Sequence, residues 1–560
     1  MESEGIYVRE ITVTLPSGKS RVVPYGTKVN EFMDEPDFKE TKYPIVGALV
    51  NNELVSLSFK VEINSHLKPV PLNTRNGARI YRRSLCFLLT IASRDIFPEW
   101  RLVISHSMGN GYYFYFDNVP NIGDEDIERL SRRMRELVEE GLPINRRVIS
   151  YTEALEHFNR MNQLDTALLL KHTNENKVPV NICRDFMDIF HEPLVPNTNI
   201  LKYFELKNYH IGFILRYPAV GNPYTIPPFR DNPILFSIYQ EYKNWGKILK
   251  VNSVGRLNEI VENKEIQEFI RVAEALHNKK IAEIADRIHE RKDTVRLVLI
   301  AGPSSSGKTT FTKKLFIQLR VLGFNPVVIS MDDYFVPREL TPRDENGRYD
   351  FESIKAIDTE LLNQHLSELL KGREVIIPDY DFKTGKRKLE GKPLKLSDQS
   401  LIIMEGIHGL NCNLTPQIDM DKKYKIYVSA LTQLNLDDHN RISTTDNRLL
   451  RRLVRDYKFR GYSALETLSR WPSVRDGENK YIFPYQNNAD SAFNSALDYE
   501  LSVLTIYAIP LLRTIKPFHE HYTEAKRLET FLNNFAPIPA HYVPRDSILR
   551  EFIGESEFKY

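Results

Sequence analysis

The sequence has few cysteines and no long apolar run. Its 3 cysteines, Cys86, Cys183 and Cys412, are too few and too scattered for a disulfide framework. The longest apolar stretches, such as residues 85–92, fall far short of the ~20 residues that a membrane-spanning helix needs. Residues 1–10 also lack the apolar core of a signal peptide. We therefore expect a soluble protein of the reducing cytoplasm, with no membrane partner.

An excess of either charge is also absent. The chain has 76 Lys and Arg against 74 Asp and Glu, a net charge of +2. This balance gives no argument for a large nucleic-acid surface, although one basic domain could be hidden in the average. At about 150 residues per domain, the 560 residues predict three or four domains.

A complete phosphate-binding loop lies in the second half of the chain. Residues Gly302 to Thr309 read GPSSSGKT, between an apolar strand pattern at 295–301 and an amphipathic helix pattern from 309. Such a loop directs backbone N–H groups at a polyphosphate, while its lysine reaches the β- and γ-phosphates and its Thr hydroxyl holds Mg²⁺. The motif predicts binding of ATP or GTP with Mg²⁺; the alternative is a ligand-free turn. The predicted binding residues are Gly302, Pro303, Ser304, Ser305, Ser306, Gly307, Lys308, Thr309 and Thr310.

Carboxylates follow two further strand patterns. The strand at 326–330 ends at Asp332 and Asp333, and the strand at 400–404 ends at Glu405. Both positions lie at the carboxyl edge of a parallel sheet, where α/β proteins bind ligands. Asp332 could accept a proton from an attacking hydroxyl, or an Asp at this position could be a helix N-cap. Thr309, Asp332 and Glu405 offer oxygen ligands that suit Mg²⁺ better than zinc.

A basic helix is predicted at 448–460. It carries Arg448, Arg451, Arg452, Arg455, Lys458 and Arg460 against a single acid, Asp456. Two interpretations remain open. The helix could be a solvated surface, or its arginines could close over a triphosphate and neutralise the transferred group.

The front of the chain resembles part of another family. Residues 1–66 alternate short strands and turns, and LPSGKSRVVPYGTKVNEFM followed by IVGALVNNELVSLSFKV resembles a TGS domain, a β-grasp module. Residues 67–225 form a predicted α+β domain similar to the second domain of threonyl-tRNA synthetases. That family has H-x-x-x-H and C-x-x-x-H pairs at an editing or metal site.

Here those pairs are incomplete. The first keeps His106 but has Asn110 in place of the second histidine, and the second keeps Cys183 but has Met187 at the next ligand position. His191 could stand in. A zinc site needs four ligands, or three and a water, so these residues favour a scaffold without a metal over a retained centre.

The remaining segments are assigned by pattern. Residues 226–292 form a helical linker whose periodic part, 257–288, has a break near 278–279 that predicts two helices. Alternating strands and helices at 293–505 predict a P-loop NTPase kinase domain with a parallel sheet. Residues 506–560 are a helical tail that packs on this domain or docks between domains.

Six blocks in the kinase region resemble the uridine/cytidine kinase family and its phosphoribulokinase relatives. They read GPSSSGKTTF, SMDDYF, RYDFESIKAID, IPDYDFKTGKRK, MEGIHGL and RLLRRLVRDYKFRG. The resemblance implies transfer of the γ-phosphate of ATP or GTP to the 5′-hydroxyl of a nucleoside. It implies that Asp332 is the catalytic aspartate and also approaches Mg²⁺, that Glu405 is a magnesium neighbour, and that Glu352 holds the ribose hydroxyls. It places Phe335, Phe351, Tyr380 and Phe382 around the base, and Lys308, Arg452, Arg455 and Arg460 around the phosphates.

One departure limits the choice of substrate. The family's base-reading histidine, expected five residues after Tyr380, is Gly385 here, so the prediction of a nucleoside acceptor is firmer than that of uridine. A phosphoribulokinase-like kinase of another small alcohol is an alternative. A third is an RNA-associated regulatory protein that uses nucleotide as a switch. The sequence leaves the oligomeric state open.

Overall fold

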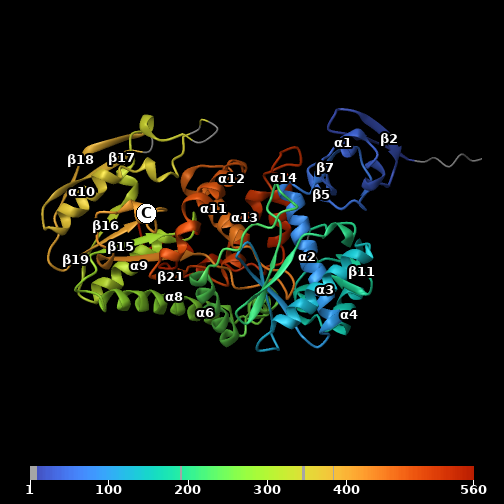
Figure 1. Ribbon diagram of the computed structural model, residues 1–560, viewed down its shortest axis with the longest axis horizontal. Coiled ribbons are helices and arrows are strands. Elements are labelled where there is room, and N and C mark those ends of the chain that lie inside the picture. Colours follow the sequence, from blue (N-terminus) through green and yellow to red (C-terminus); the bar gives the residue numbers. More distant parts are fainter. Residues whose placement is uncertain (1–8, 190–191, 344–346, 348, 382–383, 560) are drawn as a thin grey trace, which may run out of the picture.

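The computed structural model describes residues 9–189, 192–343, 347, 349–381 and 384–559. The molecule is long, with an N-terminal β-rich module at one end and the parallel sheet of the phosphate-binding loop at the other (Figure 1). Helices from the C-terminal tail lie between these two ends. Among the residues described, no helix is both long and apolar enough to cross a membrane.

The N-terminal module is a small mixed sheet. Its strand order is β2-β1-β7-β4-β5, in which β1 and β7 run parallel and the other neighbours antiparallel. Inward-facing strand side chains such as Val13 and Leu67 are fully buried, as alternation along half-buried strands requires. A sheet of this kind agrees with the β-grasp prediction. The elements are β1 (Glu10–Thr14), β2 (Ser20–Pro24), β3 (Thr27–Lys28), α1 (Pro36–Lys39), β4 (Ile45–Val50), β5 (Glu53–Val55), β6 (Lys60–Val61) and β7 (Ser65–Pro71).

The second unit is α+β, as predicted. The long helix α2 (Arg75–Ile96) and α3 (Asp124–Glu140) pack with an antiparallel sheet of order β13-β14-β9-β8, and a smaller sheet β10-β11-β12 packs with α4 and α5. The other bounds are β8 (Leu102–Met108), β9 (Gly111–Phe116), β10 (Asn145–Ser150), α4 (Tyr151–Arg160), α5 (Leu164–Lys171), β11 (Lys177–Cys183), β12 (Phe186–Asp188), β13 (Glu205–Tyr209) and β14 (Gly212–Arg216).

The linker is helical, but its break was predicted at the wrong place. It contains α6 (Pro233–Leu249), α7 (Val254–Glu262) and α8 (Ile266–His289). The chain turns at residues 263–265, and α8 runs unbroken through residues 278–279. The polar residues there remain helical because they serve the packing of α8 on α9: the Asn278 Oδ1 accepts a 2.9 Å hydrogen bond from the Lys314 ammonium.

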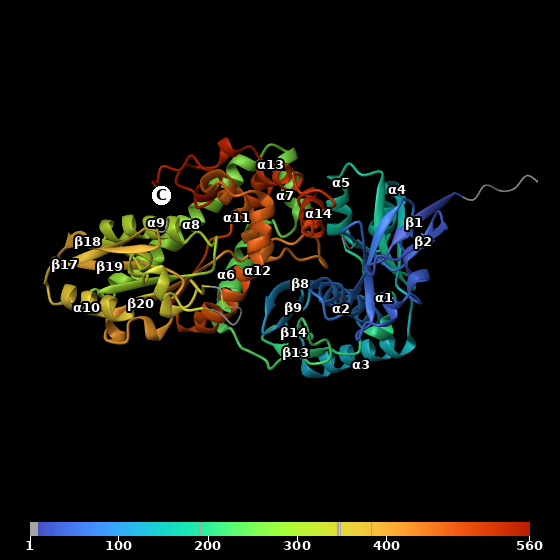
Figure 2. The same cartoon turned by 90° about the horizontal axis from the view of Figure 1, so that it is seen from above.

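A parallel five-stranded sheet forms the centre of the second half. Its order is β16-β19-β15-β20-β21, and all neighbours are parallel. The central strand β15 (Leu297–Ala301) is completely buried, because helices cover both faces (Figure 2). The other elements are α9 (Lys308–Val321), β16 (Asn325–Ser330), α10 (Thr359–Leu370), β17 (Val375–Asp381), β18 (Lys386–Leu394), β19 (Ser400–Glu405), β20 (Lys423–Ser429), α11 (Thr444–Arg460), α12 (Ala464–Tyr481) and β21 (Ser491–Asn494).

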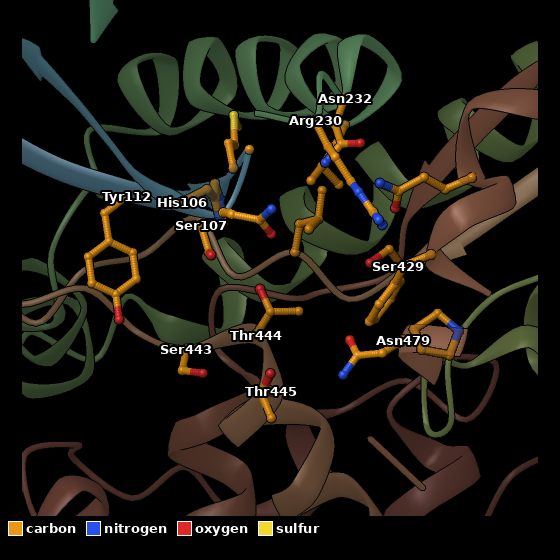
Figure 3. A pocket seen from close by; sticks show the side chains of 18 of the residues that line it. His106, Ser107, Tyr112, Arg230, Asn232, Ser429, Ser443, Thr444, Thr445 and Asn479 are labelled. Atoms are coloured by element: carbon orange, nitrogen blue, oxygen red, sulfur yellow. The ribbon is translucent and has the colours of Figure 1, made fainter. Parts of the chain in front are cut away.

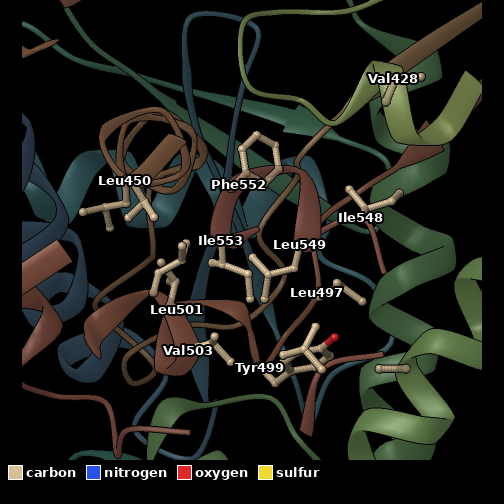
Figure 4. Close-up of a cluster of buried hydrophobic side chains, with 14 of the residues drawn as sticks. Val428, Leu450, Leu497, Tyr499, Leu501, Val503, Ile548, Leu549, Phe552 and Ile553 are labelled. Carbon is tan, nitrogen blue, oxygen red and sulfur yellow. The ribbon is translucent and has the colours of Figure 1, made fainter. Parts of the chain in front are cut away.

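The C-terminal tail both packs on the kinase core and docks on the front of the chain. Helices α13 (Glu500–Leu512), α14 (Tyr522–Leu532) and α15 (Arg550–Ile553) share one apolar core with α11 and the loop after β21. Ile548, Leu549, Phe552 and Ile553 are at most 1% exposed within it (Figure 4). The Thr523 hydroxyl also donates a 2.6 Å hydrogen bond to the Asn52 carbonyl in the first module. The tail thus contacts both the kinase core and the first module.

Residues 430–443, between β20 and α11, join the kinase unit to the second unit. The Asp438 carboxylate accepts two hydrogen bonds from Arg101, of 2.9 and 2.8 Å, and its carbonyl accepts one from the Ile104 amide. Deeper in the same interface, the Nδ1 of His439 lies 2.5 Å from an oxygen of the fully buried Asp188. Burial alone would lower the pKa of His439, but Asp188, Asp438 and Asp437 raise it to about 9. The interface therefore contains a charged histidine.

We predict that this interface weakens as the pH rises. Because the folded pKa of His439 lies above its ordinary value of 6.5, its contribution is fully present below pH ~6.5 and is lost as the pH rises through about 9. The contribution is at most about 3 kcal/mol. Burial and Asp188 also raise the pKa of Asp437, to about 7. Ionisation of Asp437 as the pH rises therefore also lowers the stability of the folded state. Thermal unfolding of the wild type at pH 6.5 and 9 should show the decrease.

The His439→Gln variant, which cannot become charged, should lose much of this pH dependence. A His439→Gln protein whose melting temperature falls with pH as steeply as the wild type would contradict the assignment. His519, a partly exposed histidine for which no ion pair is described, provides the matched control as His519→Gln.

Candidate active site

The predicted phosphate-binding loop has the required strand–loop–helix geometry. It leaves the end of β15 and enters α9 at Gly307, which has a φ of +78°. A Cβ at Gly302 would lie 2.0 Å from the Val428 carbonyl oxygen, and one at Gly307 would lie 2.5 Å from the Ile548 side chain. Both positions therefore require glycine, one for close backbone approach and one also for its positive φ.

Two arginines of α11 contact this loop and fix its position. Arg448 is 1% exposed and forms a bidentate ion pair with Glu478 of α12, and the Glu478 carboxylate also accepts a 3.0 Å hydrogen bond from the Ser304 amide. Arg451 is fully buried, pairs with Glu500 of α13 and donates to the Ser305 carbonyl at 3.3 Å. These two arginines are structural supports, so the basic helix is neither wholly a lid nor wholly a solvated surface.

Lys308 is directed back onto its own loop. Its ammonium donates hydrogen bonds to the carbonyls of Gly302, at 2.8 Å, and Pro303, at 3.2 Å. Burial lowers the pKa of Lys308, and the neighbouring carboxylates of Glu405, Glu551 and Glu478 oppose this shift. The lysine is thus a charged group in a site of low hydration, where it can act strongly on a bound anion.

The predicted magnesium-side residues meet at the ends of two paired strands. β16 and β19 run in parallel register, with Ser330 beside Glu405, and Asp332 follows in the short turn 331–334. The Thr309 hydroxyl donates to the Glu405 carboxylate at 3.1 Å. The Ser330 hydroxyl accepts from the Asp332 amide, so Ser330, and not Asp332, is the N-cap of this turn. The alternative interpretation of Asp332 was therefore wrong.

The donor set fits a hard cation. Thr309, Asp332 and Glu405 supply only oxygen atoms, which Mg²⁺ prefers, and two carboxylates suffice when phosphates and waters complete the shell. Loss of hydration raises the pKa of Asp332, whose side chain is still open to solvent, and Lys308 and Arg460 lower it in part. Burial likewise raises the pKa of Glu405, and Lys308 lowers it. A bound cation would relieve both carboxylates.

The predicted acceptor-side residues lie on the same side of the sheet. Burial and Glu478 raise the pKa of Glu352, while Lys308 and Arg452 lower it, so Glu352 is close to the loop lysine. The rings of Phe335 and Tyr380 are 5.5 Å apart. Phe351 is 42% exposed and lies 5.8 Å from the ring of Tyr349. Phe382 lies outside the described residues.

The side chain of Arg338 lies next to the position of the missing base-reading histidine. A Cβ on Gly385 would lie 2.6 Å from the Nε of Arg338, and the Arg338 amide donates to the Gly385 carbonyl. His408, in the block MEGIHGL, is buried, with its ring 6.0 Å from that of Tyr481. A guanidinium group, and not an imidazole, therefore lies beside this position of the predicted acceptor site.

The three predicted lid arginines gather around one buried acid. Arg452, Arg455 and Arg460 all form ion pairs with Asp456, which is 1% exposed, at 3.1, 2.9 and 3.6 Å. Arg452 also donates to the Ser304 hydroxyl at 2.8 Å. The three side chains thus lie next to the loop and could turn from Asp456 to a triphosphate.

Sequence reasoning missed one residue of this site. The carboxylate of Glu551, in the C-terminal helix α15, accepts hydrogen bonds from the amide of Thr310, at 3.1 Å, and from its hydroxyl, at 2.7 Å. Thr310 is the third residue of α9, so its amide is one of the unpaired donors that a helix start offers to anions. A single Glu in the segment SILREFIG carries no signal of this role.

The synthetase-like pairs do not form a ligand group. His106 is 5% exposed in β8, where burial and the charge of Arg441 lower its pKa to about 3. Cys183 belongs to a different sheet, and burial raises its pKa to about 11. His191 lies outside the described residues. In the part of the chain that is described, no group of three or more His, Cys, Asp or Glu side chains could hold a metal ion.

Comparison with known proteins gives different relatives for the two halves of the chain. Residues 297–502 match the family described as Phosphoribulokinase / Uridine kinase family. The N-terminal region is similar to threonine–tRNA ligases. The enzyme of Pelobacter propionicus is 29% identical over 196 residues, which are 35% of this chain and 31% of the relative. That of Carboxydothermus hydrogenoformans is 31% identical over 163 residues, which are 29% of this chain and 26% of the relative.

This chain thus spans less than a third of the length of these two ligases. Among solved structures, a possible uridine kinase from Bacillus stearothermophilus is 20% identical and covers 38% of this chain and all of its own, with a TM-score of 0.26. D-glycerate 3-kinase from Cryptococcus neoformans is 14% identical and covers 48% of this chain and 89% of its own, with a TM-score of 0.21. The predictions of a P-loop kinase unit and of a synthetase-like front are confirmed; the nucleoside acceptor stays a prediction.

We predict that Glu551 competes with nucleotide for the Thr310 amide. In Glu551→Gln, a neutral amide replaces the carboxylate and forms a weaker hydrogen bond, so ATP should bind about fivefold more tightly. Isothermal titration of Mg-ATP into both proteins measures this. Glu557→Gln changes an exposed glutamate of the same tail and should leave the affinity unaltered. Equal or weaker ATP binding by Glu551→Gln would show that the carboxylate does not compete.

Proposed function

We propose that this protein transfers the γ-phosphate of ATP or GTP to the 5′-hydroxyl of a nucleoside. The observation that carries the proposal is the convergence of three carboxylates, Asp332, Glu352 and Glu405, on Lys308, the lysine of the phosphate-binding loop. A nucleotide switch has no need of two acids beyond a magnesium ligand. A kinase needs one for the proton of the acceptor and one to orient it.

In the proposed reaction, Asp332 takes the proton of the acceptor hydroxyl. The new bond joins that oxygen to the γ-phosphorus, and the bond from this phosphorus to the bridging oxygen of the nucleoside diphosphate breaks. Lys308 stabilises charge on the phosphates, and Arg452, Arg455 and Arg460 exchange Asp456 for the transferred group. Mg²⁺ held by Thr309, Asp332 and Glu405 would neutralise phosphate charge.

Glu352 and the neighbouring aromatic residues would hold the acceptor. Glu352 would accept hydrogen bonds from the ribose hydroxyls, and Phe335, Tyr380, Phe351 and Phe382 would enclose the base. Arg338, beside Gly385, offers donors where the family has a histidine. Because the pattern of donors decides which base is bound well, this exchange favours a base with acceptor groups at that edge.

Two other functions remain as alternatives. The family description covers phosphoribulokinase as well as uridine kinase, so a sugar phosphate or other small alcohol is the nearest competing acceptor. The similarity of the front to threonine–tRNA ligases supports an RNA-associated regulatory role, and the near-balanced charge of the chain opposes a broad RNA surface.

Replacing Asp332 by Asn should lower kcat by ~10²- to 10⁴-fold, the usual contribution of a general base. ATP affinity should change much less. In the wild type, kcat should fall as the pH drops through the raised pKa of Asp332, because only the ionised carboxylate accepts the proton. The adjacent Asp333→Asn is the matched control and should keep nearly full activity. An Asp332→Asn enzyme with wild-type kcat would refute the assigned base.

An acceptor panel tests the role of Glu352. ADP release is measured with ribonucleosides, their 2′-deoxy forms and sugar phosphates. Glu352→Gln should reduce kcat/KM for ribonucleosides by about 10- to 100-fold, the worth of a hydrogen bond to a charged group, and should affect 2′-deoxynucleosides less. Glu360→Gln, an exposed acid at the start of α10, is the control. Turnover of sugar phosphates but of no nucleoside would favour the phosphoribulokinase-like alternative.

A further inference from the structure

A cavity of about 1010 Å³ lies between the second unit and the kinase unit, away from the magnesium-side carboxylates. Figure 3 shows how its walls come from both: His106, Ser107 and Tyr112 from the β8–β9 hairpin, Arg230 and Asn232 from the segment just before α6, and Ser443, Thr444 and Thr445 from the start of α11. Its volume is at the upper end of the range for small-molecule sites.

The lining of this cavity is strongly basic. Five of its side chains are arginines, Arg82, Arg230, Arg441, Arg448 and Arg475, and one is an acid, Asp231. The acid is engaged, because its carboxylate accepts a 2.5 Å hydrogen bond from the Tyr209 hydroxyl. His106 adds no charge, because its pKa is lowered to about 3. An anion would therefore be attracted into the cavity.

Two of the lining arginines have a buried nitrogen without a partner. The Nε of Arg448, on a side chain only 1% exposed, and the Nε of Arg82 have no hydrogen-bond partner within the described chain. A buried donor left unpaired is costly, so a ligand that accepts from it gains affinity. The start of α11, a helix of 17 residues, adds backbone amides and positive potential at Thr444 and Thr445.

The remaining walls suit the rest of a phosphorylated molecule. The lining includes aromatic side chains, which could pack against a base: Tyr112, Tyr217, Tyr427 and Phe483. It also includes polar side chains, which could form hydrogen bonds with a sugar: Ser107, Ser429 and Asn479. We propose that this cavity binds a phosphorylated small molecule of nucleotide size, with its phosphate at the start of α11 and the arginines.

The cavity is connected to the phosphate-binding loop. Arg475 and Arg448 both line it, and both pair with Glu478. Glu478 in turn holds the Ser304 amide. A phosphate that draws these arginines away from Glu478 loosens the support of Ser304, so ligand in the cavity weakens ATP binding, and ATP weakens ligand binding by the same factor.

The test is calorimetric titration of the full-length protein with uridine, uridine 5′-monophosphate, ribose 5-phosphate and inorganic phosphate. Lys308→Ala serves as a second host, because a phosphate bound at the loop itself would lose affinity there. We expect the monophosphate to bind at least tenfold more tightly than uridine, equally well to wild type and Lys308→Ala, and less tightly at higher salt.

Arg230→Glu should weaken that binding by at least tenfold, since Arg230 is exposed on the cavity wall and no structural bond of its guanidinium is described. Arg132→Glu, the same change at an exposed site on α3, should have no effect. Binding lost in Lys308→Ala but kept in Arg230→Glu would place the ligand at the loop and overturn the proposal. Failure of all phosphorylated probes would overturn it too.

Arg230→Glu separates this proposal from the proposed kinase reaction, because a substrate or product bound at the acceptor site would keep its affinity in that variant. Coupling is read from a titration of a non-hydrolysable ATP analogue with and without saturating monophosphate. A several-fold loss of analogue affinity is expected in the wild type and should be absent in Arg230→Glu. Unchanged affinity in the wild type would refute the connection through Glu478.

Discussion

The phosphate-binding loop depends on two buried ion pairs beneath it. Its amides can face an anion only if its carbonyls and its conformation are fixed from the other side, and Arg448–Glu478 and Arg451–Glu500 do this from three helices of the second half of the chain. Buried charges are tolerated only in well-made pairs. Removing one partner would leave the charge of the other uncompensated beside the loop. The conformation of the loop therefore depends on α11, α12 and α13 as well as on the strand β15 that precedes the loop.

This arrangement explains why the C-terminal tail belongs to the kinase core. The loop after β21 and the apolar face of α11 leave a groove that Ile548, Leu549 and Phe552 fill. The same tail brings Glu551 to the first turn of α9 and Glu524 to Arg79 of the second unit. One segment therefore contacts both the first turn of α9 and the front of the molecule.

The sequence was most informative where chemistry demands particular residues at fixed spacing. The loop at 302–309, the strand ends at Asp332 and Glu405 and the β-rich front could be predicted because glycine geometry, strand periodicity and turn residues act locally. The roles of Arg448 and Arg451 could not, because their partners, Glu478 and Glu500, lie 30 and 49 residues away. The break of the linker was misplaced because a polar pair at 278–279 looks like a turn until Lys314 is seen to bind it. The roles of Glu551 and of the cavity arginines could not be predicted either, because only the fold brings them close to their partners.

Several charged pairs join the two halves of the chain. Arg101 and Asp438, His439 and Asp188, and Arg79 and Glu524 all cross between them, and the arginine-lined cavity lies along the same boundary. Charged contacts respond to pH, salt and bound anions, whereas apolar contacts respond little to any of these. An interface built this way suits a front region that senses an anionic ligand. A synthetase-like domain whose metal-ligand pairs are incomplete can thus keep a role: its β8–β9 hairpin forms one wall of a site whose opposite wall is the helix that supports the phosphate-binding loop.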